Sequence, residues 1–453
     1  MGTDSIQVDA KWLAKWNRPV PRYTSYPTAP QFKPIDECLY KQHLANSGLK
    51  AVSLYIHIPF CRSMCLFCGC SVVLNRKPER QADYLNLLLK EIELVGKEIR
   101  SPVSQLHLGG GTPTSLTIAE FEKLMETLHR FFVFEANAEK SIEIDPRTVY
   151  ADGGEKLSAL KRLGFNRVSF GVQDLDPKVQ EAVKRRQSEE MSRKTFEMAR
   201  QIGFEGINID LIYGLPFQTV FSFTKTVETL SSWKPDRIAL FSYAKVPWLK
   251  PHQKAIAEET LPSTEEKFEI YVKARKVFME GGYTVIGMDH FSLHDDSMSV
   301  GYREGKLYRN FQGYSLNLAE NMIGLGITSI GFVEQGYFQN KKEIAEYEAS
   351  LACNQLPVGF GLVLSAEDRL RRWVIQELMC RFELDKQECE KIFFIDFDDH
   401  FKECNLDLFK EEGLLEETGK KIIATPLGRL VIRLIASAFD AYLIDTGRYS
   451  KLV

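Results

Sequence analysis

The sequence predicts an α/β fold in which a parallel sheet curves into a partial, TIM-like βα barrel, with an N-terminal arm and a small, mostly helical C-terminal domain. Short apolar segments alternate with helical patterns through the middle of the chain, and several of these segments end in glycine or polar residues. From about residue 361 the sequence becomes largely helical. We therefore expect an arm over residues 1–48, a partial barrel over residues 49–360 and a helical domain over residues 361–453.

The expected strands and helices follow one another in turn. Repeated strand–helix–strand units favour parallel strands joined by right-handed crossovers. The strands are expected at VSLYIHI (52–58), SQLHLGG (104–110), SIEID (141–145), RVSFGV (167–172), INIDLIY (207–213), RIALFSY (237–243) and YTVIGMD (283–289). The helices between them are expected at residues 80–99, 118–132, 155–164, 192–203 and 263–282.

The two ends of the chain differ from this pattern. The segment PRYTSYPTAPQF (21–32) is too rich in proline and tyrosine to form a regular element. The segment SAEDRLRRWVIQELMCRF (365–382) predicts a helix capped by Ser365, with an acidic first turn. Residues 413–443 predict a hairpin around Thr418-Gly419 and then a long helix. The C-terminal domain therefore has a winged-helix character.

The composition is that of an ordinary globular protein: of the 453 residues, 44% are hydrophobic and 26% are charged. The net charge of −3 leaves no basic excess to suggest nucleic acid. No segment approaches the ~18 consecutive apolar residues of a membrane helix, and the first residues have no apolar signal core. We therefore expect a cytoplasmic protein without a membrane or nucleic-acid partner. Nothing in the sequence demands an oligomer, so a monomer is expected.

The segment CRSMCLFCGC (61–70) holds four of the nine cysteines. Disulfides are rare in the cytoplasm, so a metal-binding or catalytic cluster is favoured. Structural zinc sites use a second cysteine or histidine pair, and here the nearest histidine, His57, precedes the cluster. A thioredoxin-like pair at Cys65 and Cys68 would leave the other cysteines unexplained. Thiolates are the preferred ligands of iron–sulfur clusters. The remaining five cysteines are scattered and are expected to be small apolar side chains.

Polar or glycine residues follow several of the expected strands. They are Gly109-Gly110-Gly111-Thr112, Glu143 with Asp145, Gln173 and Asp210. In α/β barrels the chemistry lies at the carboxyl ends of the strands, so these residues are expected to face one site. The glycines permit a close approach of backbone to a ligand, and they lack the Lys-Ser/Thr of a phosphate-binding loop. A plain turn for the glycines and a solvated carboxylate for Glu143 are the alternatives.

The spacing C-x3-C-x2-C after a strand is the signature of the radical S-adenosylmethionine (SAM) superfamily. Further segments run in order along nearly the whole chain: PRYTSYPT, SLYIHIPFC, CGC, QLHLGGGTPT, SIEIDPR, FGVQD, NIDLIYGLP, FSYAKVPW, GMDHF and RNFQGY. Together they resemble the oxygen-independent coproporphyrinogen III oxidase family. Related haem-chaperone-like proteins usually have an aromatic at the position of Cys70 and lack the arm. An oxidoreductase is therefore expected, with a haem-binding or haem-transfer protein and a plain electron carrier or zinc protein as alternatives.

The resemblance implies a [4Fe–4S] cluster and two SAM molecules. In the superfamily the open iron chelates SAM, and one electron cleaves it to a 5′-deoxyadenosyl radical that abstracts a hydrogen atom. The implied substrate is coproporphyrinogen III, a tetrapyrrole with four propionates. Two propionates would lose a hydrogen atom, CO2 and an electron to become vinyl groups, giving protoporphyrinogen IX for haem (porphyrin) biosynthesis. A reducing protein would supply electrons, and its identity is not implied.

The same resemblance implies roles for individual residues. The cluster ligands would be Cys61, Cys65 and Cys68. The SAM on the iron would contact Tyr55, Gly110, Glu143, Ala244 and Ile330. The second SAM would contact Phe67, Gly111, Thr112, Gln173, Arg185 and Asp210.

Three residues are expected near the reaction as catalytic candidates: Cys70, Arg22 and Tyr23. Cys70 would neighbour the cluster without binding it, and a packed thiol is the alternative. The arm, with Arg22, Tyr23 and Tyr26, would cover the substrate site. Arg22 is an expected propionate partner because a guanidinium pairs bidentately with a carboxylate. Weaker candidates for a propionate contact are Arg303, Arg309 and Gln312. Two residues depart from the family pattern: Lys245 stands where histidine is common, and Asn321 stands where aspartate is frequent.

Overall fold

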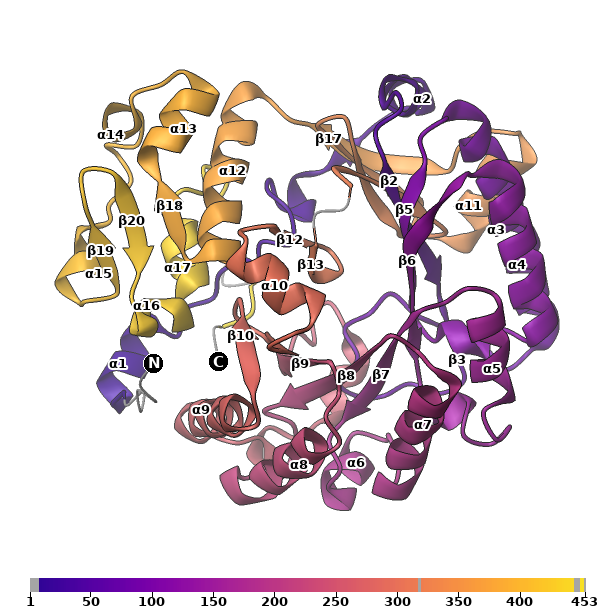
Figure 1. Ribbon diagram of the computed structural model, residues 1–453, viewed down its shortest axis with the longest axis horizontal. Coiled ribbons are helices and arrows are strands. Elements are labelled where there is room, and N and C mark those ends of the chain that lie inside the picture. The colour runs from indigo at the N-terminus through magenta and orange to yellow at the C-terminus, as the bar shows by residue number, and fades with distance from the viewer. Residues whose placement is uncertain (1–7, 317–318, 444–448, 452–453) are drawn as a thin grey trace. The chain divides into compact units, whose positions relative to one another are not determined.

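The computed structural model describes residues 8–316, 319–443 and 449–451 (Figure 1). Contacts divide the chain into two compact units. The sheet unit holds Phe32–Leu211 and Asn317–Leu364, and the arm unit holds Met1–Gln31, Ile212–Leu316 and Ser365–Val453. The expected domain boundaries near residues 48 and 360 rest on changes in the sequence pattern, and they stay a prediction. No helix in the described ranges is both long and apolar enough to cross a bilayer.

Parallel strands form the centre of the sheet unit, as the alternating pattern predicts. Strand β2 pairs in parallel with β5, and the parallel pairing continues from β5 to β6, from β6 to β7 and from β7 to β8, which confirms the expected α/β fold. Strand β14 joins the other side of β2 in parallel, and antiparallel strands continue from there. The order is β1 (Lys33–Pro34), β17 (Val358–Val363), β16 (Gly336–Asn340), β15 (Ile330–Val333), β14 (Asn321–Leu325), β2 (Val52–Ile58), β5 (Val103–Gly110), β6 (Phe134–Ile144), β7 (Arg167–Gln173) and β8 (Gly206–Tyr213).

Amphipathic helices cover one side of these strands (Figure 1). Helix α4 shows why the sequence folds in this way: Thr117 and Glu120 cap its first turn reciprocally, and its apolar residues Phe121, Leu124 and Leu128 are buried. The helices of this unit are α2 (Glu37–Asn46), α3 (Pro78–Glu98), α4 (Ile118–Phe131), α5 (Glu155–Arg162), α6 (Pro177–Ala182), α7 (Glu189–Ile202) and α11 (Ile344–Ala352).

The arm unit has a different strand arrangement. The segment expected as a parallel strand at residues 283–289 forms β10 (Tyr283–Ile286) instead, and it pairs antiparallel with β11 (His290–Leu293). The parallel expectation for this segment was wrong because a turn at Gly287, whose φ is +59°, reverses the chain. Strand β11 also pairs antiparallel with β9 (Arg237–Ser242). Around these lie α8 (Val220–Ser232), α9 (Thr264–Glu280), α10 (Ser297–Arg303), β12 (Leu307–Asn310) and β13 (Gly313–Leu316).

The last part of the chain contains the expected capped helix and hairpin. Helix α12 (Ala366–Arg381) begins at Ser365, whose side chain accepts from the N–H of Asp368. The hairpin closes where Thr418 N–H donates to Lys421 O. The expected long helix is broken at Val431, whose φ of −113° is outside the helical region, so two short helices form. The elements are β18 (Glu383–Asp385), α13 (Lys386–Phe393), α14 (Phe397–His400), α15 (Asp407–Glu411), β19 (Leu415–Glu417), β20 (Lys421–Ala424), α16 (Pro426–Leu430) and α17 (Ile432–Ser437).

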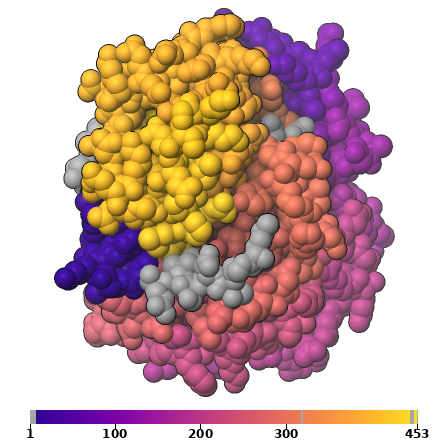
Figure 2. Space-filling view, turned by 60° about the vertical axis from the view of Figure 1, so that its left-hand side comes forward, coloured from indigo at the N-terminus to yellow at the C-terminus, as the bar shows by residue number. Residues whose placement is uncertain are grey.

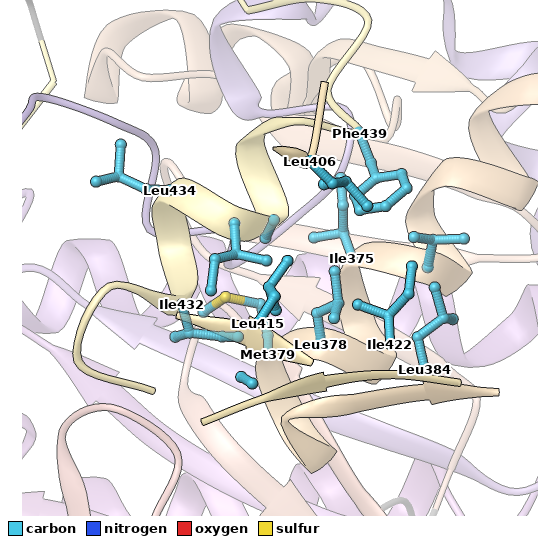
Figure 3. Close-up of a cluster of buried hydrophobic side chains, with 14 of the residues drawn as sticks. Ile375, Leu378, Met379, Leu384, Leu406, Leu415, Ile422, Ile432, Leu434 and Phe439 are labelled. Atoms are coloured by element: carbon cyan, nitrogen blue, oxygen red, sulfur yellow. The ribbon is translucent and has the colours of Figure 1, made fainter. Parts of the chain in front are cut away.

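The arm packs into the core of this C-terminal region, within the same unit. Helix α1 (Ala10–Trp16) ends at a tryptophan whose ring stacks on Phe409 at 5.3 Å. The core itself is drawn in Figure 3, where Leu378, Ile422 and Phe439 point toward one another. Figure 2 shows the first described residues (indigo) side by side with the last elements (yellow). Burial of this apolar surface holds the arm against the C-terminal region.

Candidate active site

The four clustered cysteines lie on one loop at the carboxyl end of β2. Cys61 ends the short strand β3 (Phe60–Cys61), which pairs with β4 (Val73–Leu74). Cys65 is buried, Cys61 and Cys68 are half-buried, and Cys70 is exposed. The N–H of Cys68 donates to Cys65 O at 3.1 Å, so the loop turns between the two. None of these four takes part in a disulfide.

The thiols of the loop are close enough to affect one another. The pKa of Cys61 is raised to about 11, chiefly by burial and to a smaller extent by Cys68 and Cys65, while a hydrogen bond with Thr112 opposes the rise. The Sγ atom of Cys61 lies 3.3 Å from Thr112 Oγ1. A side-chain hydrogen bond with Cys68 raises the pKa of Cys70. The loop therefore gathers the three predicted ligands, with Cys70 beside them.

Two guanidinium groups point at the sulfur of Cys65. Arg185 Nη1 donates to Cys65 Sγ at 3.6 Å, and Arg147 Nη2 donates to it at 3.9 Å. Asp145 holds both arginines: its Oδ2 atom accepts from Arg147 at 2.6 Å and from Arg185 at 3.4 Å. Burial would raise the pKa of Asp145, but Arg185 and then Arg147 lower it to about 2. Two positive N–H donors are therefore directed at the sulfur of a predicted cluster ligand.

Arg147 was not among the predicted site residues, and Asp145 was expected only as a polar residue at a strand end that faces the site. The signal was present, because Asp145-Pro-Arg147 directly follows strand β6, where a polar strand end was noted. What the sequence could not supply is the contact with Cys65, which lies 82 positions earlier than Arg147.

The glycine segment after β5 packs its backbone closely against the cysteine loop. Gly110 has φ of +114°, and a Cβ there would lie 2.7 Å from the ring of His57. A Cβ on Gly111 would lie 2.6 Å from Pro59 O. The N–H of Thr112 donates to Phe60 O at 2.9 Å. The plain-turn alternative would not require this close approach, so the glycines here are required by packing.

Glu143 lies beside this segment, on β6. Its Oε2 atom accepts from Gly110 N–H at 3.2 Å, and its Oε1 atom lies 3.4 Å from His107 Nε2. The ring of Tyr55 stacks on His107 at 6.0 Å. The predicted residues Tyr55, Gly110 and Glu143 are therefore neighbours at the ends of three adjacent parallel strands.

His57 was not predicted, yet it orients Tyr55. Its Nε2 atom lies 2.9 Å from the carbonyl oxygen of Ser71, so Nε2 carries the proton and donates. Its Nδ1 atom therefore accepts from the Tyr55 hydroxyl, at 3.1 Å. Burial lowers the pKa of His57, which favours this neutral tautomer.

The remaining predicted residues of the sheet unit lie at strand ends. Gln173 ends β7 with φ of +71°, and Arg185 Nη2 donates to Gly171 O at 2.6 Å on the same strand. Asp210 accepts from Ser169 Oγ at 3.0 Å and from Asn208 Nδ2 at 2.7 Å. Phe67 is half-buried in the cysteine loop, Ile330 begins β15, and Asn321 donates through Nδ2 to Glu334 Oε1 at 3.1 Å.

The other predicted residues belong to the arm unit. Arg22 Nη2 lies 3.6 Å from Asp289 Oδ2, and the Tyr23 hydroxyl donates to Asp440 Oδ2 at 3.0 Å. Ala244 follows β9, and Lys245 forms an ion pair with Glu258. The weaker candidates are Arg303, whose Nη1 donates to His294 O at 3.0 Å, Arg309, whose Nε donates to Arg22 O at 3.2 Å, and Gln312, whose N–H donates to Asn310 at 2.8 Å.

The cysteine loop offers the thiols that a [4Fe–4S] cluster with one open iron needs. Among the described residues, no three His, Cys, Asp or Glu side chains are grouped closely enough to hold one metal ion. A four-iron cluster takes one thiolate on each of three irons, so its ligands lie farther apart than those of a single ion. The loop offers three such thiols. The sulfur of Cys65 also accepts hydrogen bonds from two guanidinium groups, and hydrogen bonds to a ligand atom orient and tune a bound metal centre.

Comparison with known proteins agrees with this geometry. Residues 55–230 match the Radical SAM superfamily, and residues 364–431 match the HemN C-terminal domain. The oxygen-independent coproporphyrinogen III oxidase of Synechocystis sp. is 42% identical over 98% of this chain and 97% of its own length. That of Escherichia coli K12 is 40% identical over 100% of this chain and 99% of its own.

A solved structure, described as coproporphyrinogen III oxidase (HemN) from Escherichia coli, a radical SAM enzyme, also matches. Its TM-score is 0.91 at 39% identity, covering 97% of this chain and 100% of that one. The expected fold, and the expectation of an oxidoreductase enzyme, are thereby confirmed. The chain belongs to the oxygen-independent coproporphyrinogen III oxidase family of radical SAM enzymes.

Proposed function

We propose that this enzyme converts coproporphyrinogen III into protoporphyrinogen IX without oxygen, as a step of porphyrin biosynthesis. Each of two propionate side chains loses a hydrogen atom from the carbon β to its carboxylate, then CO2 and one electron, which passes to an electron acceptor, and becomes a vinyl group. The names of the relatives, at about 40% identity over nearly the full chain, support this substrate. When bound, the cluster and SAM supply the one-electron chemistry that removes the hydrogen atom.

Cys61, Cys65 and Cys68 hold the cluster in this proposal. Arg185 and Arg147 direct N–H donors at the sulfur of Cys65. Cys70 stays beside the cluster without binding it. This arrangement of three thiols, with two guanidinium groups directed at one of them, is the observation that carries the proposal.

Two SAM molecules bind, one for each decarboxylation. Glu143 accepts from the first through a carboxylate already oriented by Gly110 N–H, with Tyr55, Gly110, Ala244 and Ile330 as its other contacts. The second contacts Phe67, Gly111, Thr112, Gln173, Arg185 and Asp210. The Asp210 carboxylate is oriented for this task by Ser169 and Asn208.

The arm has two proposed roles. Arg22 binds a substrate carboxylate, and the arm covers the bound substrate with Tyr23 and Tyr26 in its core. The hydroxyl of Tyr23 is held by Asp440, so we assign Tyr23 to positioning the arm and Arg22 to the contact with substrate. A reducing protein supplies the electrons. The cytoplasmic location and the monomeric state stay predictions.

Product analysis tests the proposal. The protein is reconstituted anaerobically with iron and sulfide, reduced, and supplied with SAM and coproporphyrinogen III, and products are followed by mass spectrometry. We expect two molecules each of 5′-deoxyadenosine and methionine for every doubly decarboxylated tetrapyrrole. Tight haem binding without substrate-dependent SAM cleavage, or SAM cleavage that leaves the tetrapyrrole unchanged, would contradict the proposed reaction.

A further inference from the structure

The arm unit contains a partly open cavity. Its walls come from segments far apart in the sequence: Arg22 lies on the arm, Asp289 lies between β10 and β11, and Arg433 lies on α17. Aromatic and apolar side chains complete the lining, among them Tyr213, Phe268 and Tyr271. The cavity therefore combines apolar walls with guanidinium groups.

The positive charges at this cavity outnumber the carboxylates. Arg22, Arg429 and Arg433 line it, and Asp289 is the acidic residue in its wall. The carboxylate of Asp289 is already shared. Its Oδ1 accepts from His290 Nδ1 at 2.6 Å and lies 3.6 Å from Arg309 Nη1, and its Oδ2 lies 3.6 Å from Arg22 Nη2. Both arginine distances exceed those of a direct hydrogen bond, so Asp289 forms only a longer ion pair with each guanidinium.

Arg433 carries a buried charge whose contacts are neutral. The residue is 4% exposed. Its Nη1 donates to Val20 O at 3.3 Å and to Ser450 Oγ at 3.2 Å, and its Nη2 donates to Lys451 O at 2.7 Å. Among the residues that the structure describes, it forms no ion pair with a carboxylate. A buried charge is costly unless an opposite charge compensates it, so the site is suited to an anion.

A second buried guanidinium supports this interpretation. Arg309 is 2% exposed, and within the described part of the chain its Nη1 atom has no hydrogen-bond partner. Burial and the excess positive charge lower the pKa values of two basic side chains around the cavity. Burial and then Arg22 lower the pKa of Arg433 to about 9, and burial, Arg22 and Arg433 lower the pKa of Lys267 to about 7. An anion in the cavity would relieve this repulsion.

We propose that this cavity binds one carboxylate of the tetrapyrrole substrate, with Arg433 and Arg22 as its guanidinium partners and the aromatic wall against the attached pyrrole. The assignment rests on the proposed function and extends it, because Arg433 and the cavity had no assigned role. A propionate on a pyrrole suits the site better than a phosphate does. Guanidinium groups bind carboxylate and phosphate alike, but here they stand next to Tyr213, Phe268 and Tyr271, which suit an attached pyrrole ring.

Direct binding tests the assignment without turnover. Oxidised coproporphyrin III, which retains the four carboxylates, is titrated against the reconstituted holoenzyme and followed by fluorescence. We expect Arg433→Gln and Arg22→Gln each to raise the Kd by about tenfold or more, because each removes a charge-assisted hydrogen bond to the ligand. Arg433→Lys retains the charge but not the fork geometry, so an intermediate Kd is expected. The uncharged tetramethyl ester should bind the wild type and both glutamine variants equally.

Matched controls separate the cavity from general charge and from SAM. Lys276→Gln removes one positive charge from the exposed face of α9 in the same unit, where it pairs with Glu280 at 3.8 Å, and should leave the Kd unchanged. SAM also carries a carboxylate, and its Kd should be the same in all variants. A loss of SAM binding in Arg433→Gln would assign the cavity to SAM and overturn the proposal.

The remaining outcomes distinguish a failure of the cavity assignment from a failure of the proposed reaction. Arg22 is 35% exposed, so Arg22→Gln tests the cavity even if Arg433→Gln fails to fold. Wild-type Kd values in Arg22→Gln and in a folded Arg433→Gln or Arg433→Lys would overturn the cavity assignment and leave the proposed reaction intact. A wild-type enzyme that binds neither coproporphyrin III nor coproporphyrinogen III would overturn both.

Discussion

Arg185 Nη1 donates to the sulfur of Cys65 at 3.6 Å, from a position 120 residues later in the sequence. The same guanidinium is held by Asp145, which also binds Arg147. One buried carboxylate thus compensates two cations beside a predicted cluster ligand. The Asp145 carboxylate is consequently both a structural counter-charge and the element that aims two donors at the thiolate.

Replacing Asp145 should destabilise the fold and make it less sensitive to acid. Asp145→Asn leaves two largely buried guanidinium groups uncompensated, and we expect a loss of about 3–5 kcal/mol in the free energy of unfolding at neutral pH. The pKa of about 2 in the folded state lies below the ordinary aspartate value of 3.8, so the wild-type carboxylate stabilises the fold at neutral pH. That stabilisation is lost as the pH falls from about 4 through 2, and the variant should lack this part of the decline.

Urea unfolding at several pH values measures both effects. Asp83→Asn, at an exposed position on α3, is the matched control and should behave as the wild type. Equal stability of Asp145→Asn and the control at neutral pH would show that Asp145 is not the counter-charge of the two arginines.

The four clustered cysteines should separate into ligands and a neighbour. Single changes of Cys61, Cys65 or Cys68 to Ala should abolish cluster binding, because each removes a thiolate that the cluster needs. Cys70→Ala should retain iron and lose turnover. Iron and sulfide content, with the visible absorbance, measures this. Cys353→Ala, exposed at the end of α11, is the control. Full iron content in Cys65→Ala would refute the ligand set.

A methyl group at Gly110 should impair SAM binding. Its φ of +114° is strained for any other residue, and the added Cβ would lie 2.7 Å from the His57 ring. The contact displaces His57, and with it the hydrogen-bonded Tyr55 and the amide that orients Glu143. We expect the Kd for SAM, measured by equilibrium dialysis, to rise at least about tenfold in Gly110→Ala, which corresponds to ~1.4 kcal/mol.

Gly69→Ala provides the comparison within the cysteine loop. A Cβ on Gly69 meets no atom within 4 Å, and its φ is not positive. This variant should therefore bind SAM as the wild type does. If both alanine variants bind SAM normally, close backbone packing at Gly110 is not what shapes the site.

Glu91 should make the stability of the protein fall as the pH rises toward 7. Its buried carboxylate accepts from Gly326 N–H at 2.7 Å, from Asn340 Nδ2 at 2.5 Å and from the Tyr347 hydroxyl. Burial outweighs these bonds and raises its pKa from 4.5 to about 7. The folded state therefore holds the proton more tightly than the unfolded state. The stabilisation is complete below about pH 4.5 and is lost as the pH rises through 7.

The Glu91→Gln variant cannot titrate at this position, so its stability should lack this decline. We expect the difference between wild type and variant to change by on the order of 3 kcal/mol between pH 4.5 and 7. Chemical unfolding at a series of pH values measures it, with Glu122→Gln on the exposed face of α4 as the control. A parallel pH dependence in the wild type and Glu91→Gln would mean that Glu91 is ionised throughout.

Local patterns made much of the fold predictable. The segment VSLYIHI matches β2 residue for residue, and Ser365 caps α12 as expected, because both depend on neighbouring residues. Strand direction depends on distant pairing instead. The turn at Gly287 sends β10 into an antiparallel hairpin, and the single non-helical residue Val431 divides the last helix. Neither the antiparallel pairing of β10 nor the break at Val431 can be predicted from the spacing of hydrophobic residues.

Some residues of the candidate site could likewise be predicted from local patterns, whereas others depend on contacts between distant parts of the chain. The cysteine spacing and the strand ends pointed to Cys61, Glu143 and Gln173, since chemistry at the carboxyl ends of parallel strands follows from topology. The contact of Arg433 with Val20 joins residues 413 positions apart, and no local pattern carries that information. The roles of Arg147 and His57, and the contacts of Asp145 with two arginines, could not be predicted for the same reason.

The most direct test of the account is Mössbauer spectroscopy of the protein reconstituted with isotopically enriched iron, recorded before and after addition of SAM. Three thiolate ligands leave one iron of a [4Fe–4S] cluster open, so SAM should change the signal of one iron in four and leave the other three as they were. The same change should occur in Cys70→Ala. Four equivalent irons that do not respond to SAM would contradict the account, because every iron would then have a permanent protein ligand.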